Sequence, residues 1–148
     1  MVYRNLYEME DVDIEKLVGI VFDKICVDED NPEIKFYTKE ETYLMAHDQD
    51  CCENVYIEDI CGDLNDLVGS PITLAECSKY DDTDDCEEYG NMNFKSEYRH
   101  DDSYTWTFYK FATVKGYVTI RWYGDSNGYF GTEVDFKKME INTRSIYG

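Results

Sequence analysis

The chain has 148 residues, and its 33 acidic and 14 basic side chains give it a net charge of −19 at pH 7. Such a surface repels phosphate backbones and anionic lipids, which argues against direct binding of nucleic acid or of a membrane. Hydrophobic residues make up 43% and aromatic residues 16%, which excludes a disordered polymer and suffices for the core of one domain spanning residues 1–148.

The first part of the chain predicts one short helix followed by three strands. Asp13 fits an N-cap, and the apolar side chains after it recur at helical spacing until Gly19. The strands are predicted from alternating apolar residues, with a turn at "DNP" and another at "KEE". They lie at residues 19–29, 33–38 and 42–47.

The middle of the chain predicts a second helical segment, a strand and an acidic loop. Residues 63–71 look like one or two helical turns that Gly69 closes and Pro71 stops. A strand follows at residues 71–80. Residues 81–88, "DDTDDCEE", are acidic at six of eight positions, and the polar run continues to residue 102. We therefore expect a long exposed loop over residues 81–102.

The clearest local pattern is a long hairpin near the end of the chain. Alternating apolar side chains on either side of a "KG" turn predict two paired strands with one apolar face. These side chains are Tyr104, Trp106 and Phe108, and then Val118, Ile120 and Trp122. A further strand is predicted at residues 129–136. Together the elements predict an α+β fold, with one curved antiparallel sheet and two short helices against it.

The segment "AHDQDCCENVYIEDICGD", residues 46–63, combines a histidine, three cysteines and six acidic residues. Structural zinc takes four thiolate or imidazole ligands in a tetrahedron. The candidate ligands are His47, Cys51, Cys52 and Cys61. Their spacing, H-x3-C-C-x8-C, is not a standard zinc-finger pattern, so buried thiols and redox chemistry stay open as alternatives. Cys77, Cys86 and His100 are weaker candidates, and Cys26, in a predicted strand, is expected to be an ordinary core residue.

The N-terminal segment resembles no signal peptide, and no window approaches the ~20 apolar residues that span a bilayer. We therefore expect a cytoplasmic protein, in which clustered cysteines suggest a metal site more than disulfides. Enzymatic chemistry has little support. A Cys–His pair could supply a nucleophile and its base, but neighbouring carboxylates raise a thiol pKa and weaken it. No Gly-rich phosphate loop and no G-x-S-x-G motif is present.

Two long motifs resemble a family with a domain of unknown function. They are "HDQDCCENVYIEDICGDLNDLVGSPITLAE" at residues 47–76 and "SYTWTFYKFATVKGYVTIRWYGDSNGYF" at residues 103–130, and the resemblance covers roughly residues 12–136. Members of that family occur in phages and in bacterial genomes that carry phage-derived genes. The resemblance supplies a setting for the protein and no activity.

Within that setting the chain is similar to a type II anti-CRISPR protein that holds a structural zinc ion. The implied partner is a basic nucleic-acid-handling protein, the RNA-guided type II effector nuclease, whose channels an acidic monomer would block without chemistry. The alternatives are a small metal- or thiol-dependent enzyme, or a phage protein that sequesters a small host molecule on the concave face of its sheet. The predicted contact residues are Asp48, Asp50, Glu53, Glu58 and Asp59, and the loop residues Asp81, Asp82, Asp84, Asp85, Glu87 and Glu88.

Overall fold

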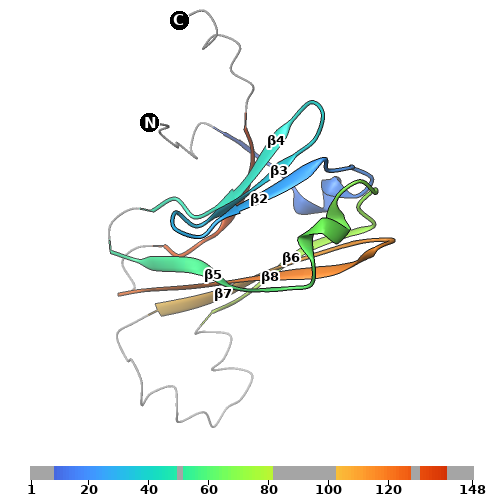
Figure 1. The fold of residues 1–148 in the computed structure, drawn as a ribbon. Helices are drawn as coiled ribbons and strands as arrows, with labels where there is room; N and C mark the ends of the chain where they lie inside the picture. Colours follow the sequence, from blue (N-terminus) through green and yellow to red (C-terminus); the bar gives the residue numbers. More distant parts are fainter. Residues whose placement is uncertain (1–8, 50–51, 82–102, 128–130, 140–148) are drawn as a thin grey trace, which may run out of the picture.

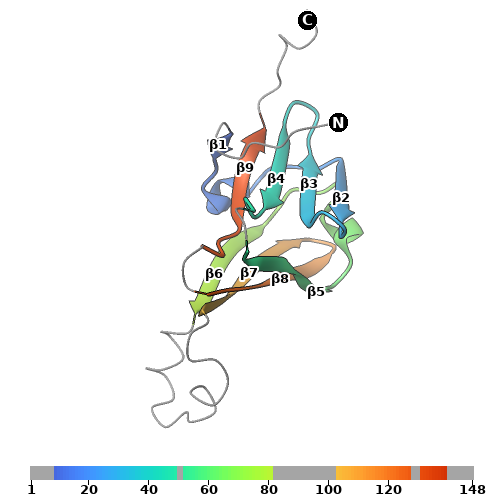
Figure 2. The same ribbon diagram turned by 90° about the vertical axis from the view of Figure 1, so that its left-hand side faces the viewer.

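The computed structural model of the chain describes residues 9–49, 52–81, 103–127 and 131–139. These residues fold into two antiparallel sheets that pack face to face (Figures 1 and 2). The first sheet has the strand order β1-β9-β4-β3-β2, and the second has the order β5-β8-β7-β6. The strands are β1 (Glu10–Asp11), β2 (Lys24–Asp28), β3 (Glu33–Tyr37), β4 (Thr42–Ala46), β5 (Asn54–Cys61), β6 (Leu74–Asp81), β7 (Ser103–Thr113), β8 (Gly116–Ser126) and β9 (Asp135–Met139).

The predicted α+β class is wrong, because the two helical segments are single 3-10 turns: η2 (Ile14–Leu17) and η3 (Leu64–Leu67). The predicted N-cap Asp13 is confirmed, and Asp63 caps the second turn in the same way; each side chain accepts a backbone N–H two residues later. Four residues are too few to establish α-helical i to i+4 bonding, so the tighter bonding pattern forms instead. Both turns lie at the same end of the sandwich in Figure 1, and each buries one leucine.

The predicted single curved sheet is also wrong, because the cysteine segment contains a strand that was not predicted. This strand, β5, pairs with β8 in the second sheet, so the chain leaves the first sheet after β4. It returns to the first sheet between β8 and β9, where β9 pairs with β4. Two crossovers, residues 47–53 and the segment that precedes β9, therefore connect the layers.

The core fills the space between the two inner faces. Phe36 of β3 contacts Phe22, Phe111 of the second sheet and Phe136, with ring centroids 5.2, 5.7 and 5.4 Å away. Trp122 of β8 is 1% exposed, and its indole N–H donates to the Met45 sulfur across the layers at 3.2 Å. In the described part of the chain, each sheet thus covers the inner face of the other.

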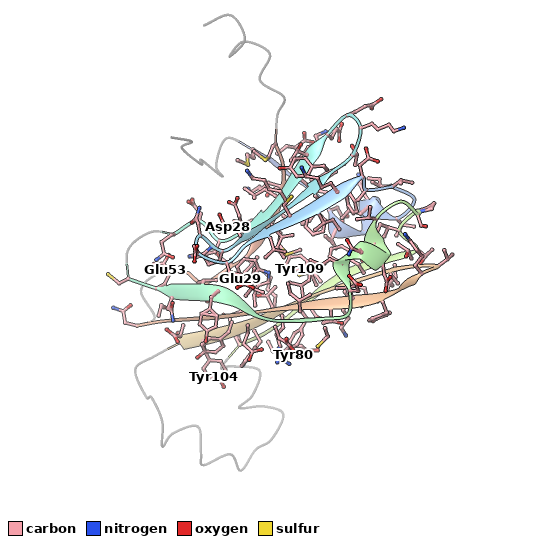
Figure 3. The ribbon with its side chains drawn as sticks, viewed as in Figure 1. Asp28, Glu29, Glu53, Tyr80, Tyr104 and Tyr109 are labelled. Atoms are coloured by element: carbon pink, nitrogen blue, oxygen red, sulfur yellow. The ribbon has the colours of Figure 1, made fainter. Side chains whose placement is uncertain are left out.

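The predicted hairpin is confirmed as β7 and β8, which pair over eleven residues each around a two-residue turn. Its two apolar sets, however, lie on opposite faces. Trp106 is opposite Tyr123, and Phe108 is opposite Arg121, so these four side chains share the outer face. Figure 3 shows Tyr104 on this outer side and Tyr109 between the sheets. The side chains of β7 that face Trp122 are instead those of Thr107, Tyr109 and Phe111.

Among the described residues, none of the helices is long and apolar enough to cross a membrane.

Candidate interaction surface

Side chains of the first crossover, His47, Gln49 and Glu53, make hydrogen bonds that hold its two ends together. His47, directly after β4, is buried, and its Nδ1 lies 2.6 Å from the Glu133 backbone oxygen on the returning crossover. Its Nε2 lies 2.7 Å from Oε2 of Glu53, whose side chain is fully buried. The Gln49 side-chain amide donates to the Glu53 backbone oxygen at 2.8 Å. The His-x-Gln-x-x-x-Glu pattern thus ties the two crossovers together.

The hydrogen bonds of His47 determine where its protons must be. A backbone carbonyl only accepts, so Nδ1 carries a proton and donates it to the Glu133 oxygen. The contact between Nε2 and Glu53 then contains one more proton, either as an imidazolium facing a carboxylate or as an imidazole facing a carboxylic acid. Both ring nitrogens therefore have partners within the protein, the Glu133 backbone oxygen and the Glu53 carboxyl group.

The structure does not bring the described members of the predicted zinc set together. His47 and Glu53 lie at the start of β5, whereas Cys61 is its last residue, about 23 Å along a strand of this length. Cys52 is disulfide-bonded and so is not a thiolate, and Cys51 lies outside the described residues. Among the residues that the structure describes, no group of three or more His, Cys, Asp or Glu side chains could hold a metal ion.

Two free thiols of the described chain, those of Cys61 and Cys77, have raised pKa values. The Cys61 sulfur donates to Oδ2 of Asp59 at 3.2 Å, and this hydrogen bond raises the pKa of the exposed thiol. Burial raises the pKa of Cys77. A reactive thiolate requires the opposite shift. Cys26, predicted to be a core residue, is exposed because it points outward from the edge strand β2. Cys86 and His100 lie outside the described residues.

The outer face of the second sheet carries a pre-formed cation site that its own arginine occupies. A β-bulge between Ile57 and Asp59 directs two neighbouring carboxylates toward Arg121 of β8. Oε1 of Glu58 lies 2.6 Å from Nε and 2.5 Å from Nη2 of Arg121, and Oδ2 of Asp59 lies 3.7 Å from Nη2. The guanidinium lies over the Trp106 ring, 5.7 Å from its centroid. The hydrogen bond to Glu58 raises the Arg121 pKa further.

Beside Arg121, four aromatic side chains form one row across all four strands, which we call the aromatic row: Tyr56, Tyr123, Trp106 and Tyr80. Strand register sets this row, since each residue is directly opposite the next. Ring centroids are 5.8 Å apart for Tyr56 and Tyr123, and 4.7 Å apart for Trp106 and Tyr123. At the β6 edge, Tyr80 packs edge-on against Phe108 at 5.7 Å. Figure 3 shows Tyr80 pointing away from the first sheet.

The predicted acidic contact residues lie in different places, and not all of them are on the surface. Glu58 and Asp59 are exposed on the outer face, beside the aromatic row. Asp48 is half-buried, and Glu53 is buried against His47, so Glu53 is not available to a partner. Asp81 ends β6 next to Tyr80. The remainder lie outside the described residues: Asp50, Asp82, Asp84, Asp85, Glu87 and Glu88.

A second feature is an open groove of about 690 Å³ at the β3–β4 turn. Its lining includes Asp23, Glu40 and Glu41, with Lys39 as a cation, and Tyr43 at its inner end. The Tyr43 hydroxyl donates to Oε1 of Glu41 at 3.0 Å. Burial, together with this hydrogen bond, raises the pKa of Tyr43 to about 12. Three acidic side chains and one basic side chain thus line the groove.

A family model, described as a domain of unknown function (DUF7448), matches residues 1–136. No curated protein and no solved structure matches the chain.

Proposed function

The chain belongs to the family with the domain of unknown function DUF7448, and from its own surface we propose that it is a non-catalytic, acidic binding protein. Its partner is a basic, nucleic-acid-handling protein, and its carboxylates take the place of phosphates at that partner's surface. The observation that carries this proposal is the net charge of −19.

Three basic side chains of the described surface are paired with neighbouring carboxylates. Lys137 bonds Asp11 at 2.7 Å, and Lys138 lies 3.4 Å from Glu10. Arg121 is held by Glu58 and Asp59. A hydrogen bond to Asp11 raises the pKa of Lys137, and the charge of Glu10 raises that of Lys138, as expected in a negative field. Because these positive groups are already paired, the surplus carboxylates determine the potential that a partner meets.

The narrower form of the proposal is a phage- or prophage-encoded inhibitor that acts in the host cytoplasm on a type II CRISPR effector nuclease. Such effectors hold nucleic acid in strongly basic channels, which an acidic protein can fill. The alternatives have less support: the Cys61 and Cys77 thiols have raised pKa values. His47 has both ring nitrogens bonded within the protein.

The test is a target-DNA cleavage assay with a type II effector and its guide, in which the protein is added before or after the DNA. We expect inhibition only when the protein is added first. Binding to the guide-free effector should also weaken steeply as salt rises, because the attraction is between oppositely charged surfaces. Charge reversal at Glu58 and Asp59 tests the described surface, and reversal at residues 81–88 tests the predicted loop.

Full cleavage by several type II effectors at every order of addition would remove the anti-CRISPR form. If the protein also fails to bind basic DNA- and RNA-binding proteins at low salt, the whole class of function is excluded. Rapid labelling of one cysteine together with a catalytic turnover would favour the enzyme instead.

A further inference from the structure

The two ends of the aromatic row are exposed, and its two middle rings, Trp106 and Tyr123, are half-buried on the outer face. Tyr56 is 37% exposed and Tyr80 is 51% exposed, while the inner face of the same sheet is complete with Phe111, Ile120 and Trp122. Exposed aromatic residues usually occur singly, whereas here one is aligned on each of four neighbouring strands. With strands about 4.8 Å apart, the row extends over about 14 Å. Trp, Tyr and Arg are the residue types that dominate binding at protein interfaces.

Arg121 shows what chemistry this face accepts. Its guanidinium lies over the Trp106 ring and is bonded to the bulge carboxylate of Glu58. A planar cation between an aromatic ring and a carboxylate is a favourable combination, which uses both cation–π attraction and charge-assisted hydrogen bonds. Tyr56 and Tyr80 extend the aromatic surface on either side of that site, and Asp59 and Asp125 add carboxylates along it.

Charge decides among the possible occupants. Nucleic acid bases could stack on the row, but a chain of net charge −19 repels their phosphates. A second copy of the chain carries the same charge and is repelled in the same way. A protein surface that presents arginine is attracted by both the carboxylates and the rings.

We propose that the aromatic row, with the bulge carboxylates of Glu58 and Asp59, is the docking site for arginine side chains of a basic protein. This inference rests on the proposed function and specifies the surface by which it is carried out. Arginine is favoured over lysine, because a guanidinium stacks on rings and bonds carboxylates at the same time.

The experiment follows the two tryptophan indole N–H signals by NMR while a nona-arginine peptide is added at physiological salt. The chain has two tryptophans, and Trp122 is 1% exposed with its N–H bonded to Met45, so it serves as the internal control. We expect the Trp106 signal to shift and the Trp122 signal to stay. Nona-lysine should produce a smaller shift of Trp106 at equal concentration.

The double variant Tyr56→Ser, Tyr80→Ser should weaken nona-arginine binding about fivefold or more, as expected from the loss of two exposed cation–π contacts. The matched control is Tyr117→Ser. Tyr117 is 53% exposed on the same face but lies near the β7–β8 turn, three rows from Tyr123. The Tyr117→Ser variant should bind the peptide like the wild-type protein. Circular dichroism and the unchanged Trp122 signal show that each variant is folded.

Three results would overturn the inference: binding of nona-arginine without a Trp106 shift, equal weakening by the control variant, or equal shifts with both peptides. A dimer in sedimentation that the double variant abolishes would assign the row to a second copy. A Trp106 shift in a protein that inhibits no effector would leave this surface in place while removing the anti-CRISPR form. If the double variant still inhibits the effector, the anti-CRISPR form would stand and the aromatic row would not be the docking site.

Discussion

The buried pair of His47 and Glu53 is the residue-scale feature with the clearest chemistry. Two side chains from one crossover share a proton, and the histidine donates its other proton to the Glu133 backbone oxygen on the second crossover. Inside the protein, losing one partner of such a pair leaves a polar group without compensation, which costs more than the pair itself contributes. The pair therefore links the two crossovers at this end of the sandwich.

Substitution of Glu53 should reveal this role. We expect Glu53→Ala to lower the free energy of unfolding by about 3 kcal/mol, because it removes the buried carboxylate that contacts Nε2 of the imidazole. Glu53→Gln retains a hydrogen-bonding group at Nε2 and should cost about 1 kcal/mol. Urea denaturation measures both values, with the exposed Glu40→Ala as the control. Equal small effects for all three variants would show that the pair of His47 and Glu53 does not stabilise the folded state.

The predicted zinc site depends on how close its candidate ligands lie to one another in the fold. Cys61 is the last residue of β5, whereas His47 contacts Glu53 just before the first residue of that strand, so this fold keeps the two candidate ligands apart. We expect that a chelator leaves the melting temperature unchanged, and that elemental analysis of protein purified without added metal gives no stoichiometric zinc. A parallel sample with reductant alone separates any effect of the Cys52 disulfide. Stoichiometric zinc whose removal lowers the melting temperature would restore the predicted site.

At the scale of elements, local patterns predicted strands well and their arrangement poorly. Alternation located the hairpin and the strands at residues 33–38 and 42–47, because side chains on a half-buried strand alternate between two environments. It missed β5, whose exposed face carries Tyr56, Glu58 and Asp59 and reads as a polar loop. The hairpin had apolar side chains on both faces, so alternation alone could not choose the inner one. Counting back from the two-residue turn would have placed Trp106 opposite Tyr123 and revealed the aromatic row.

Two glycines with positive φ separate torsional strain from crowding. Gly62, directly after β5, has φ +108°, and a Cβ there would lie 2.5 Å from the Tyr117 backbone oxygen. Gly19, after η2, has φ +97° with open space around it. Gly19→Ala should cost about 1–2 kcal/mol from backbone strain alone. Gly62→Ala should cost at least about 1 kcal/mol more, because the β8 backbone must move. Equal losses in urea denaturation would mean that β5 and β8 are not this close.

At the scale of the whole molecule, the apolar side chains gather in the core and the surplus charge lies on the surface. The sandwich core is formed by aromatic and aliphatic side chains from both sheets, so the surface can carry a large surplus of one charge. Sequence composition alone gives this surplus, and the basic partner inferred from it stays a prediction. Composition could not predict which exposed side chains lie together on one face, since that depends on the pairing of strands far apart in the chain, such as β5 with β8.

Two tyrosines in that core predict how stability depends on alkaline pH. Burial, with the hydrogen bond to Glu41, raises the pKa of Tyr43 to about 12, and burial raises that of Tyr109 well above its usual value. A raised pKa in the folded state means that the unfolded chain releases the proton first. The stabilisation is therefore fully present below about pH 10 and is lost as pH rises from 10 through about 12.

For Tyr43 this loss is on the order of 2 kcal/mol across that interval. The Tyr43→Phe variant has no proton to release there, so its free energy of unfolding should fall less steeply above pH 10 than that of the wild-type protein. Urea denaturation at a series of pH values gives both slopes, and absorbance at 295 nm follows tyrosinate directly. Parallel curves for the two proteins would mean that the Tyr43 hydroxyl ionises as easily in the folded chain as in the unfolded one. The close packing of Tyr43 between the sheets and its bond to Glu41 lead us to expect that the curves diverge.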